Sequence, residues 1–148
     1  MSFSEHELKE SRTLKNLIDL FSREAQILIR YRLFANTAKY EGFPEVAELF
    51  DRLTQHQSVL VEGHLDFLRT VGDPLSGLPL GHTDHNLDAA LAGEDEAETL
   101  YPLAARTAEN EGFVDIASWF QTLAASKKLH CNQIANEIRR ISETGEQQ

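Results

Sequence analysis

Glu24, Glu94 and His130 are the residues of this chain whose types and spacing best fit metal chemistry. Carboxylate and imidazole groups on facing helices are the side chains that hold pairs of divalent ions in helical bundles. The helical period places both glutamates inside apolar stripes and the histidine beside one. The chemistry to expect from such a set is the binding of iron or manganese and the redox reactions of that metal.

An internal repeat relates these residues to one another. Residues 31–53 (YRLFANTAKYEGFPEVAELFDRL) align without a gap with residues 101–123 (YPLAARTAENEGFVDIASWFQTL), at an offset of 70 positions. The same offset relates three pairs of polar or former polar positions: Glu24 with Glu94, Gln57 with Lys127, and Leu60 with His130. Comparison of equivalent positions therefore shows where one half has a polar core residue and the other half does not.

The elements that must position these residues are helices. Apolar residues recur at helical spacing and predict four long helices, at roughly residues 12–40, 44–71, 84–110 and 114–141. Gly42 and Gly112 follow the first and third of these, where glycine suits a left-handed helix end. Two hairpins joined by a long crossover predict an all-α fold, an antiparallel four-helix bundle of the ferritin-like kind in a single domain spanning residues 1–148.

The three pairs are expected to lie at similar depth along this bundle. Members of the first and third pairs each lie 18 residues from the glycine of their own turn, and members of the second lie three residues nearer. Eighteen residues of helix correspond to about 27 Å. Side chains from all four helices are therefore predicted to converge.

A carboxylate-bridged di-metal site takes one Glu from each of two helices and a Glu-x-x-His motif from each of the other two. The corresponding motifs here read Gln57-x-x-Leu60 and Lys127-x-x-His130. Three of six ligand types remain, and both bridging glutamates are replaced. The sequence therefore predicts an incomplete site.

The chain resembles the rubrerythrins over roughly residues 12–141. The resemblance rests on Glu24 followed by Tyr31, the KYEGF and ENEGF turns, Tyr101-Pro102 and the repeat. It implies a di-iron centre that reduces peroxide, with electrons from a rubredoxin-type iron–sulfur domain. The chain has no cysteine pairs for such a domain. The resemblance also implies a further carboxylate on the third helix, for which Glu96 and Glu98 are the candidates.

Lys127 lies on the core stripe of the last helix, where an unpaired ammonium is strongly destabilising. We interpret it as the cation that replaces the metal between Glu24 and Glu94. Gln57 and His130 would complete the hydrogen bonds. In the alternative, the ammonium extends to the surface, and the smaller ligand set left behind is Glu24, Glu94, Glu96 and His130.

Two functional hypotheses follow. In the first, the protein is a non-enzymatic, metal-free structural or binding module that acts through its surface or as a homodimer, with an unknown protein or small molecule as partner. In the second, it is a peroxidase-type oxidoreductase that keeps a reduced centre with iron or manganese. The amount of metal bound per chain separates the two.

Other candidate residues have simpler explanations. His56 and His64 flank Leu60 by one helical turn each, and a histidine at such spacing is more often a packing or surface residue. The stretch His82-x-x-His85-x-x-Asp88 has ligand-like spacing but lies where a helix is expected to begin. Cys131 is expected to be buried as a small apolar residue. Tyr31 and Tyr101 could donate protons beside a metal, and as repeat-related aromatics they also suit the core.

Composition narrows the class of partner. The net charge of −10 argues against nucleic acid and anionic membranes, because no basic stripe is present to neutralise phosphate. The chain begins with charged residues rather than an apolar signal, and has no long apolar run. A single cysteine leaves no intramolecular disulfide. These features predict a cytoplasmic protein.

Overall fold

The computed structural model describes residues 4–146 and is helical almost throughout. It contains α1 (Glu5–Lys9), α2 (Arg12–Glu41), α3 (Pro44–Leu68), α4 (Thr83–Asn110) and α5 (Val114–Glu146), and residues 4–146 contain no strand. The predicted all-α fold of two repeated helical hairpins is confirmed. The chain divides into two compact units, Met1–Pro74 and Leu75–Gln148, each built around one hairpin.

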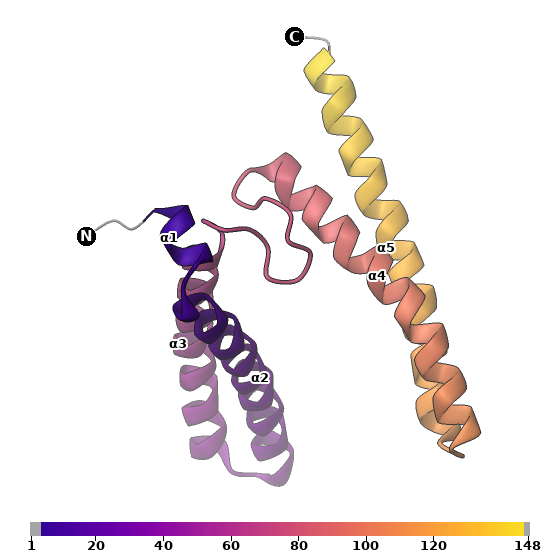
Figure 1. Ribbon diagram of the computed structural model, residues 1–148. Coiled ribbons are helices and arrows are strands. Elements are labelled where there is room, and N and C mark those ends of the chain that lie inside the picture. Colours follow the sequence, from indigo (N-terminus) through magenta and orange to yellow (C-terminus); the bar gives the residue numbers. More distant parts are fainter. Residues whose placement is uncertain (1–3, 147–148) are drawn as a thin grey trace. The chain divides into compact units, whose positions relative to one another are not determined.

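The first hairpin pairs α2 with α3, which run side by side in Figure 1. Three small residues, Ala35, Ala38 and Ala47, are almost fully buried where the helices approach each other. The ring of Phe50 packs against Tyr31, with centroids 5.9 Å apart, and against Phe34 at 5.4 Å. Small side chains thus permit close approach of the backbones, and aromatic rings fill the space beside them.

The second hairpin pairs α4 with α5 and repeats this packing. Its buried alanines, Ala105, Ala108 and Ala117, stand at the repeat-equivalent positions. The rings of Tyr101 and Phe120 lie 5.7 Å apart, matching the tyrosine–phenylalanine contact of the first hairpin. Two halves with different polar residues therefore share one packing scheme.

The two hairpin turns are built alike. Gly42 and Gly112 have φ of 83° and 88°, a left-handed conformation that glycine adopts without a steric penalty. The next residue donates its backbone N–H to the helix behind it, Phe43 to the Ala38 carbonyl and Phe113 to the Ala108 carbonyl, both at 2.8 Å. These bonds use carbonyls that a helix end leaves unpaired.

Helix boundaries differ from the sequence prediction in three places. α3 ends at Leu68 rather than near residue 71, and α5 continues beyond residue 141 to Glu146. α1 is absent from the sequence prediction, because five residues are too few to show a helical period. It begins at a capping box in which Ser4 and Glu7 exchange hydrogen bonds, and hydrogen bonding by Ser4, chiefly by its backbone N–H, lowers the pKa of the Glu7 carboxyl.

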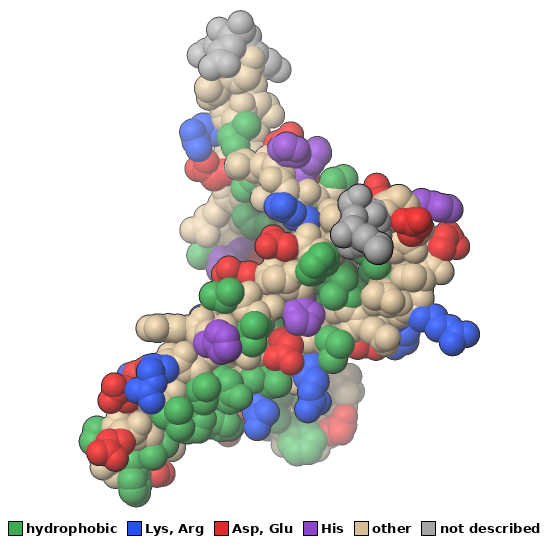
Figure 2. Space-filling view, turned by 90° about the vertical axis from the view of Figure 1, so that its left-hand side faces the viewer, with side chains coloured by type: hydrophobic (Ala, Val, Ile, Leu, Met, Phe, Trp, Pro, Cys, Tyr) green, Lys and Arg blue, Asp and Glu red, His purple; other side chains and the backbone are tan. Residues whose placement is uncertain are grey.

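The surface is mixed in charge. On the face drawn in Figure 2, acidic and basic side chains are interspersed rather than gathered by sign, and several apolar side chains lie together. Within the described part of the chain, none of the helices combines the length and apolar character needed to cross a lipid bilayer.

Candidate functional site

In the first hairpin, Glu24 of α2 faces Gln57 of α3. The amide nitrogen of Gln57 donates to the Glu24 carboxylate and also to the Glu24 backbone carbonyl, the latter at 3.1 Å. Gln57 is only 8% exposed, and it is the polar residue among the buried side chains of α3. Both amide protons are thereby used. A neutral group therefore satisfies the carboxylate within this hairpin.

In the second hairpin, Glu94 of α4 faces two groups of α5. The Lys127 ammonium lies 3.2 Å from one carboxylate oxygen of Glu94 and 3.1 Å from the other. His130 Nδ1 lies 3.2 Å from the second oxygen. The side chains of Lys127 and Glu94 are 26% and 22% exposed, so this ion pair is partly shielded from water. A cation therefore satisfies the carboxylate here.

The two pairs occupy the same place in their hairpins. Each joins residues 33 positions apart, so the turn and the packing of small residues set both contacts. Leu60, the counterpart of His130, is exposed and offers no ligand atom. The further expectation, that the Lys127 ammonium also neutralises Glu24, stays a prediction.

The remaining metal candidates lie apart from these pairs. The Glu96 side chain is exposed, as is His56. His64 Nδ1 lies 2.9 Å from the Leu60 carbonyl, an interaction within one helix. Tyr31 and Tyr101 pack on phenylalanine rings, as described above.

The histidines at the start of α4 belong to a helix terminus. His82 is the N-cap residue, and its ring meets that of His85 edge-on with centroids 5.7 Å apart. The Asn86 side chain accepts a hydrogen bond from the Gly81 N–H at 2.9 Å, and Asp88 is exposed. These contacts account for the polar character of the stretch.

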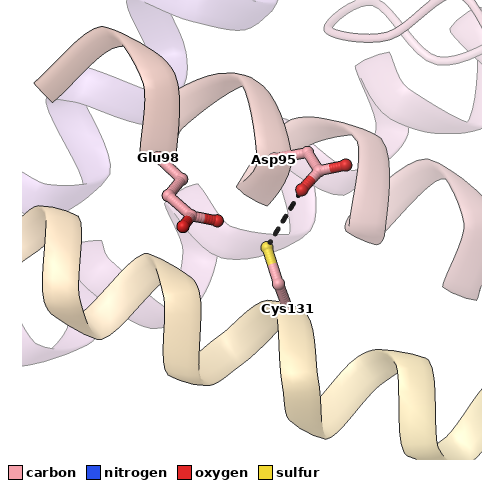
Figure 3. Close-up of side chains that lie close together, drawn as sticks. All are labelled: Asp95, Glu98 and Cys131. Carbon is pink, nitrogen blue, oxygen red and sulfur yellow. Dashed lines mark hydrogen bonds between the residues drawn. The ribbon is translucent and has the colours of Figure 1, made fainter.

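Sequence reasoning named Glu98 as a candidate ligand and Cys131 as a buried residue, but it did not group them with Asp95. Within residues 4–146, the potential metal ligands that lie closest together as a trio are Asp95, Glu98 and Cys131, with one atom of each within 4.8 Å of the others. Figure 3 shows both carboxylates of α4 directed toward the thiol of α5, with a hydrogen bond from Sγ to Asp95 Oδ1 at 3.6 Å. Burial raises the pKa of the Cys131 thiol, and the hydrogen bond to Asp95 raises it further.

A sequence signal for this trio does exist. Asp95 precedes Cys131 by 36 residues, the same interval that separates Glu94 from His130. The repeat-equivalent positions in the first hairpin are apolar, namely Ala25, Leu28 and Val61. The second half therefore has three polar groups where the first has none.

Known proteins match this chain along most of its length. A sequence model of the Rubrerythrin family matches residues 85–147. Rubrerythrin-1 of Clostridium acetobutylicum is 34% identical over 145 residues, covering 92% of this chain and 74% of that relative. The chain belongs to the rubrerythrin family.

Other rubrerythrins agree with this assignment. The rubrerythrin of Porphyromonas gingivalis is 38% identical over 130 residues, covering 83% of this chain and 64% of the relative. That of Nitratidesulfovibrio vulgaris is 33% identical over 142 residues, covering 92% and 74%. The family and the ferritin-like fold class predicted from the sequence are both confirmed. Rubrerythrins usually bind iron.

Proposed function

We propose that this rubrerythrin-family chain is a metal-free, non-enzymatic module, in which contacts between side chains replace the family's iron centre. The observation that carries the proposal is the Lys127 ammonium, 3.1 Å from Glu94. At this position a four-helix di-iron protein has a glutamate of a Glu-x-x-His motif. A lysine there supplies positive charge to the neighbouring carboxylate without a metal ion.

The donor atoms of these residues fit two iron ions poorly. Two divalent ions held close together need several carboxylates to offset their charge. Glu24 is hydrogen-bonded to an amide, Glu94 is paired with an ammonium, and Leu60 offers no donor. We infer that a bridged pair of irons is not this chain's resident cofactor.

The replacement contacts have a structural role in this proposal. Truncating one partner of a shielded ion pair is costly, because the remaining charge loses its partner. The net gain from an intact pair is smaller, since desolvation offsets much of the attraction. The Lys127–Glu94 contact therefore supports the fold chiefly by preventing an uncompensated carboxylate in the hairpin.

The alternative is a peroxidase-type oxidoreductase with a single iron or manganese ion. The 3.2 Å contact between His130 Nδ1 and Glu94 favours it, because imidazole and carboxylate are both ligands for such ions. The Lys127 ammonium would have to leave Glu94 for a cation to bind there. The ligands would then be Glu94 and His130, with Glu24 and Glu96 as further candidates.

The proposed module associates with a second copy of itself. Within each hairpin taken by itself, large apolar side chains are exposed at repeat-equivalent positions, which supports a surface that is covered in solution. The exposed pairs are Leu33 and Leu103, Phe43 and Phe113, Val46 and Ile116, Leu49 and Trp119, and Val59 and Leu129. Sedimentation equilibrium at micromolar concentration is expected to give twice the chain mass, whereas a monomer would contradict self-association.

Elemental analysis tests the central proposal. Untagged full-length chain, expressed in medium supplemented with iron and manganese, is expected to contain far less than one mole of either metal per mole of chain. A content of one or more, together with peroxide turnover that a chelator abolishes, would contradict the metal-free module and support the alternative.

A further inference from the structure

We propose that Asp95, Glu98 and Cys131 bind one divalent ion of the zinc class within the second hairpin. This site does not include Glu94, Lys127 or His130, and it shares only Glu98 with the candidate ligands of the family's iron centre.

The geometry of the trio is close to that of a bound ion. The ligand atoms lie within 4.8 Å of one another, and Sγ of Cys131 is 3.6 Å from Asp95 Oδ1. Ligands at zinc distances of about 2.0–2.3 Å lie about 3.3–3.8 Å apart in a tetrahedron. The Asp95–Cys131 edge already has this length, and rotation of the Glu98 side chain can close the remainder.

Helix geometry fixes the direction of these groups. Asp95 and Glu98 are three residues apart on α4, so they share one face of that helix. Cys131 is 8% exposed on α5 and faces them (Figure 3). Because all three backbones are helical, the ligands are held by regular elements rather than by loops.

The charge around the trio favours a cation. Within residues 4–146, neither Asp95 nor Glu98 has a lysine, arginine or histidine at ion-pair distance, in contrast to Glu94 beside Lys127. A divalent ion would offset the charge of the two carboxylates.

Packing alone does not account for these residues. The equivalent positions of the first hairpin are Ala25, Leu28 and Val61, and the same alanine and aromatic packing forms around them. Apolar side chains therefore suffice for the scaffold. Asp95 is exposed and Glu98 half-buried, and the convergence of both carboxylates on the buried Cys131 thiol points to a ligand.

The ligand atoms also select the class of ion. Thiolate sulfur is a soft ligand that favours zinc and similar ions, whereas magnesium and calcium take oxygen ligands. Three protein ligands leave the fourth tetrahedral position to water. Binding forms a metal–sulfur bond and releases the thiol proton to the buffer.

Cobalt(II) titration of untagged full-length chain tests the proposal, since cobalt replaces zinc and reports a bound thiolate by near-ultraviolet absorption. We expect this band to saturate at one cobalt per chain and to vanish on addition of zinc. The matched variants carry the first hairpin's residues: Cys131→Val is expected to abolish the band, and Asp95→Ala or Glu98→Leu to weaken cobalt binding at least about tenfold. Circular dichroism verifies that each variant remains folded.

Two further measurements keep the outcome clear. Glu109→Gln is expected to leave the cobalt band unchanged, because that carboxylate is exposed on α4 and lies outside the trio. In the unmodified chain, excess zinc is expected to slow the reaction of Cys131 with an uncharged thiol reagent. Absence of the band at millimolar cobalt, or a band that survives Cys131→Val, would overturn the proposal. Neither result bears on the iron and manganese content.

Discussion

The two hairpins have nearly the same scaffold and different polar residues upon it. Buried alanines, tyrosine–phenylalanine contacts and left-handed glycine turns recur at equivalent positions. At equivalent depth in the two hairpins, the first pairs Glu24 with a neutral amide, and the second pairs Glu94 with an ammonium and an imidazole. Backbone packing therefore constrains the repeat more strongly than the chemistry of its polar positions.

The comparison also shows where the halves have diverged most. Glu24 and Glu94 are identical, and the residues facing them, Gln57 and Lys127, differ in charge. On the same helices, one to four positions further along, an apolar trio in the first half corresponds to Asp95, Glu98 and Cys131 in the second. Polar groups are thus concentrated in the second hairpin.

The largest expected effect, on iron content, comes from substitutions that introduce the ligand types of a di-metal site into both halves. The triple variant Gln57→Glu, Leu60→His, Lys127→Glu carries the ligand types that four-helix di-iron proteins use. We expect iron content after anaerobic loading to rise from near zero to about one or two per chain. The double variant that retains Lys127 is the control and should remain near zero. Equal iron in both variants would show that Lys127 does not prevent binding.

Enlarging the buried alanines tests whether the helices of the two hairpins pack in the same way. Ala35→Leu and Ala105→Leu each insert a bulky side chain where the helices approach closely, since these alanines are 1% and 3% exposed. Overpacking of this kind costs about 1–3 kcal/mol of unfolding free energy. Urea unfolding should give similar losses for the two variants. A loss confined to one hairpin would contradict the shared packing scheme.

Exchanging the polar partner tests the difference between the halves. Lys127→Ala is expected to lower the unfolding free energy by about 1–2 kcal/mol, between the values for exposed and buried pairs. Lys127→Gln imposes the first hairpin's glutamate–glutamine pair and should cost less than about 1 kcal/mol. Thermal unfolding at neutral pH measures both. Equal losses would mean that the amide cannot replace the ammonium here.

Substitutions in the two turns should lower the unfolding free energy least, and by the same amount in both hairpins. Gly42→Ala and Gly112→Ala place a Cβ in a left-handed conformation at about 1 kcal/mol each, and no other atom lies within 4 Å of the added carbon at either site. The cost therefore comes from the backbone alone. Asparagine, which tolerates this conformation better, is the control. Urea midpoints that differ between the two alanine variants would indicate unequal turns.

Much of the fold follows from sequence because its signals are local. The helical period, the turn glycines and the repeat define two hairpins, and the repeat offset alone is enough to pair Glu24 with Glu94. The sequence does not predict α1, because its start depends on the Ser4–Glu7 capping box rather than on a period. The Asp95–Glu98–Cys131 trio escapes sequence reasoning because the helical stripe marks Cys131 only as buried. The 36-residue interval between Asp95 and Cys131 indicates their proximity only once the contact between Glu94 and His130, at the same interval, is known.

The two glycine turns also bear on how the chain folds. Each brings together helices that are adjacent in sequence, so the contacts within a hairpin close short loops, a feature that favours fast folding. All of the first hairpin's helix–helix contacts are available once residue 74 has been made. At about 5–20 residues per second, the remaining half needs roughly 4–15 s more to be synthesised. During translation, the first hairpin therefore has time to form before the second is complete.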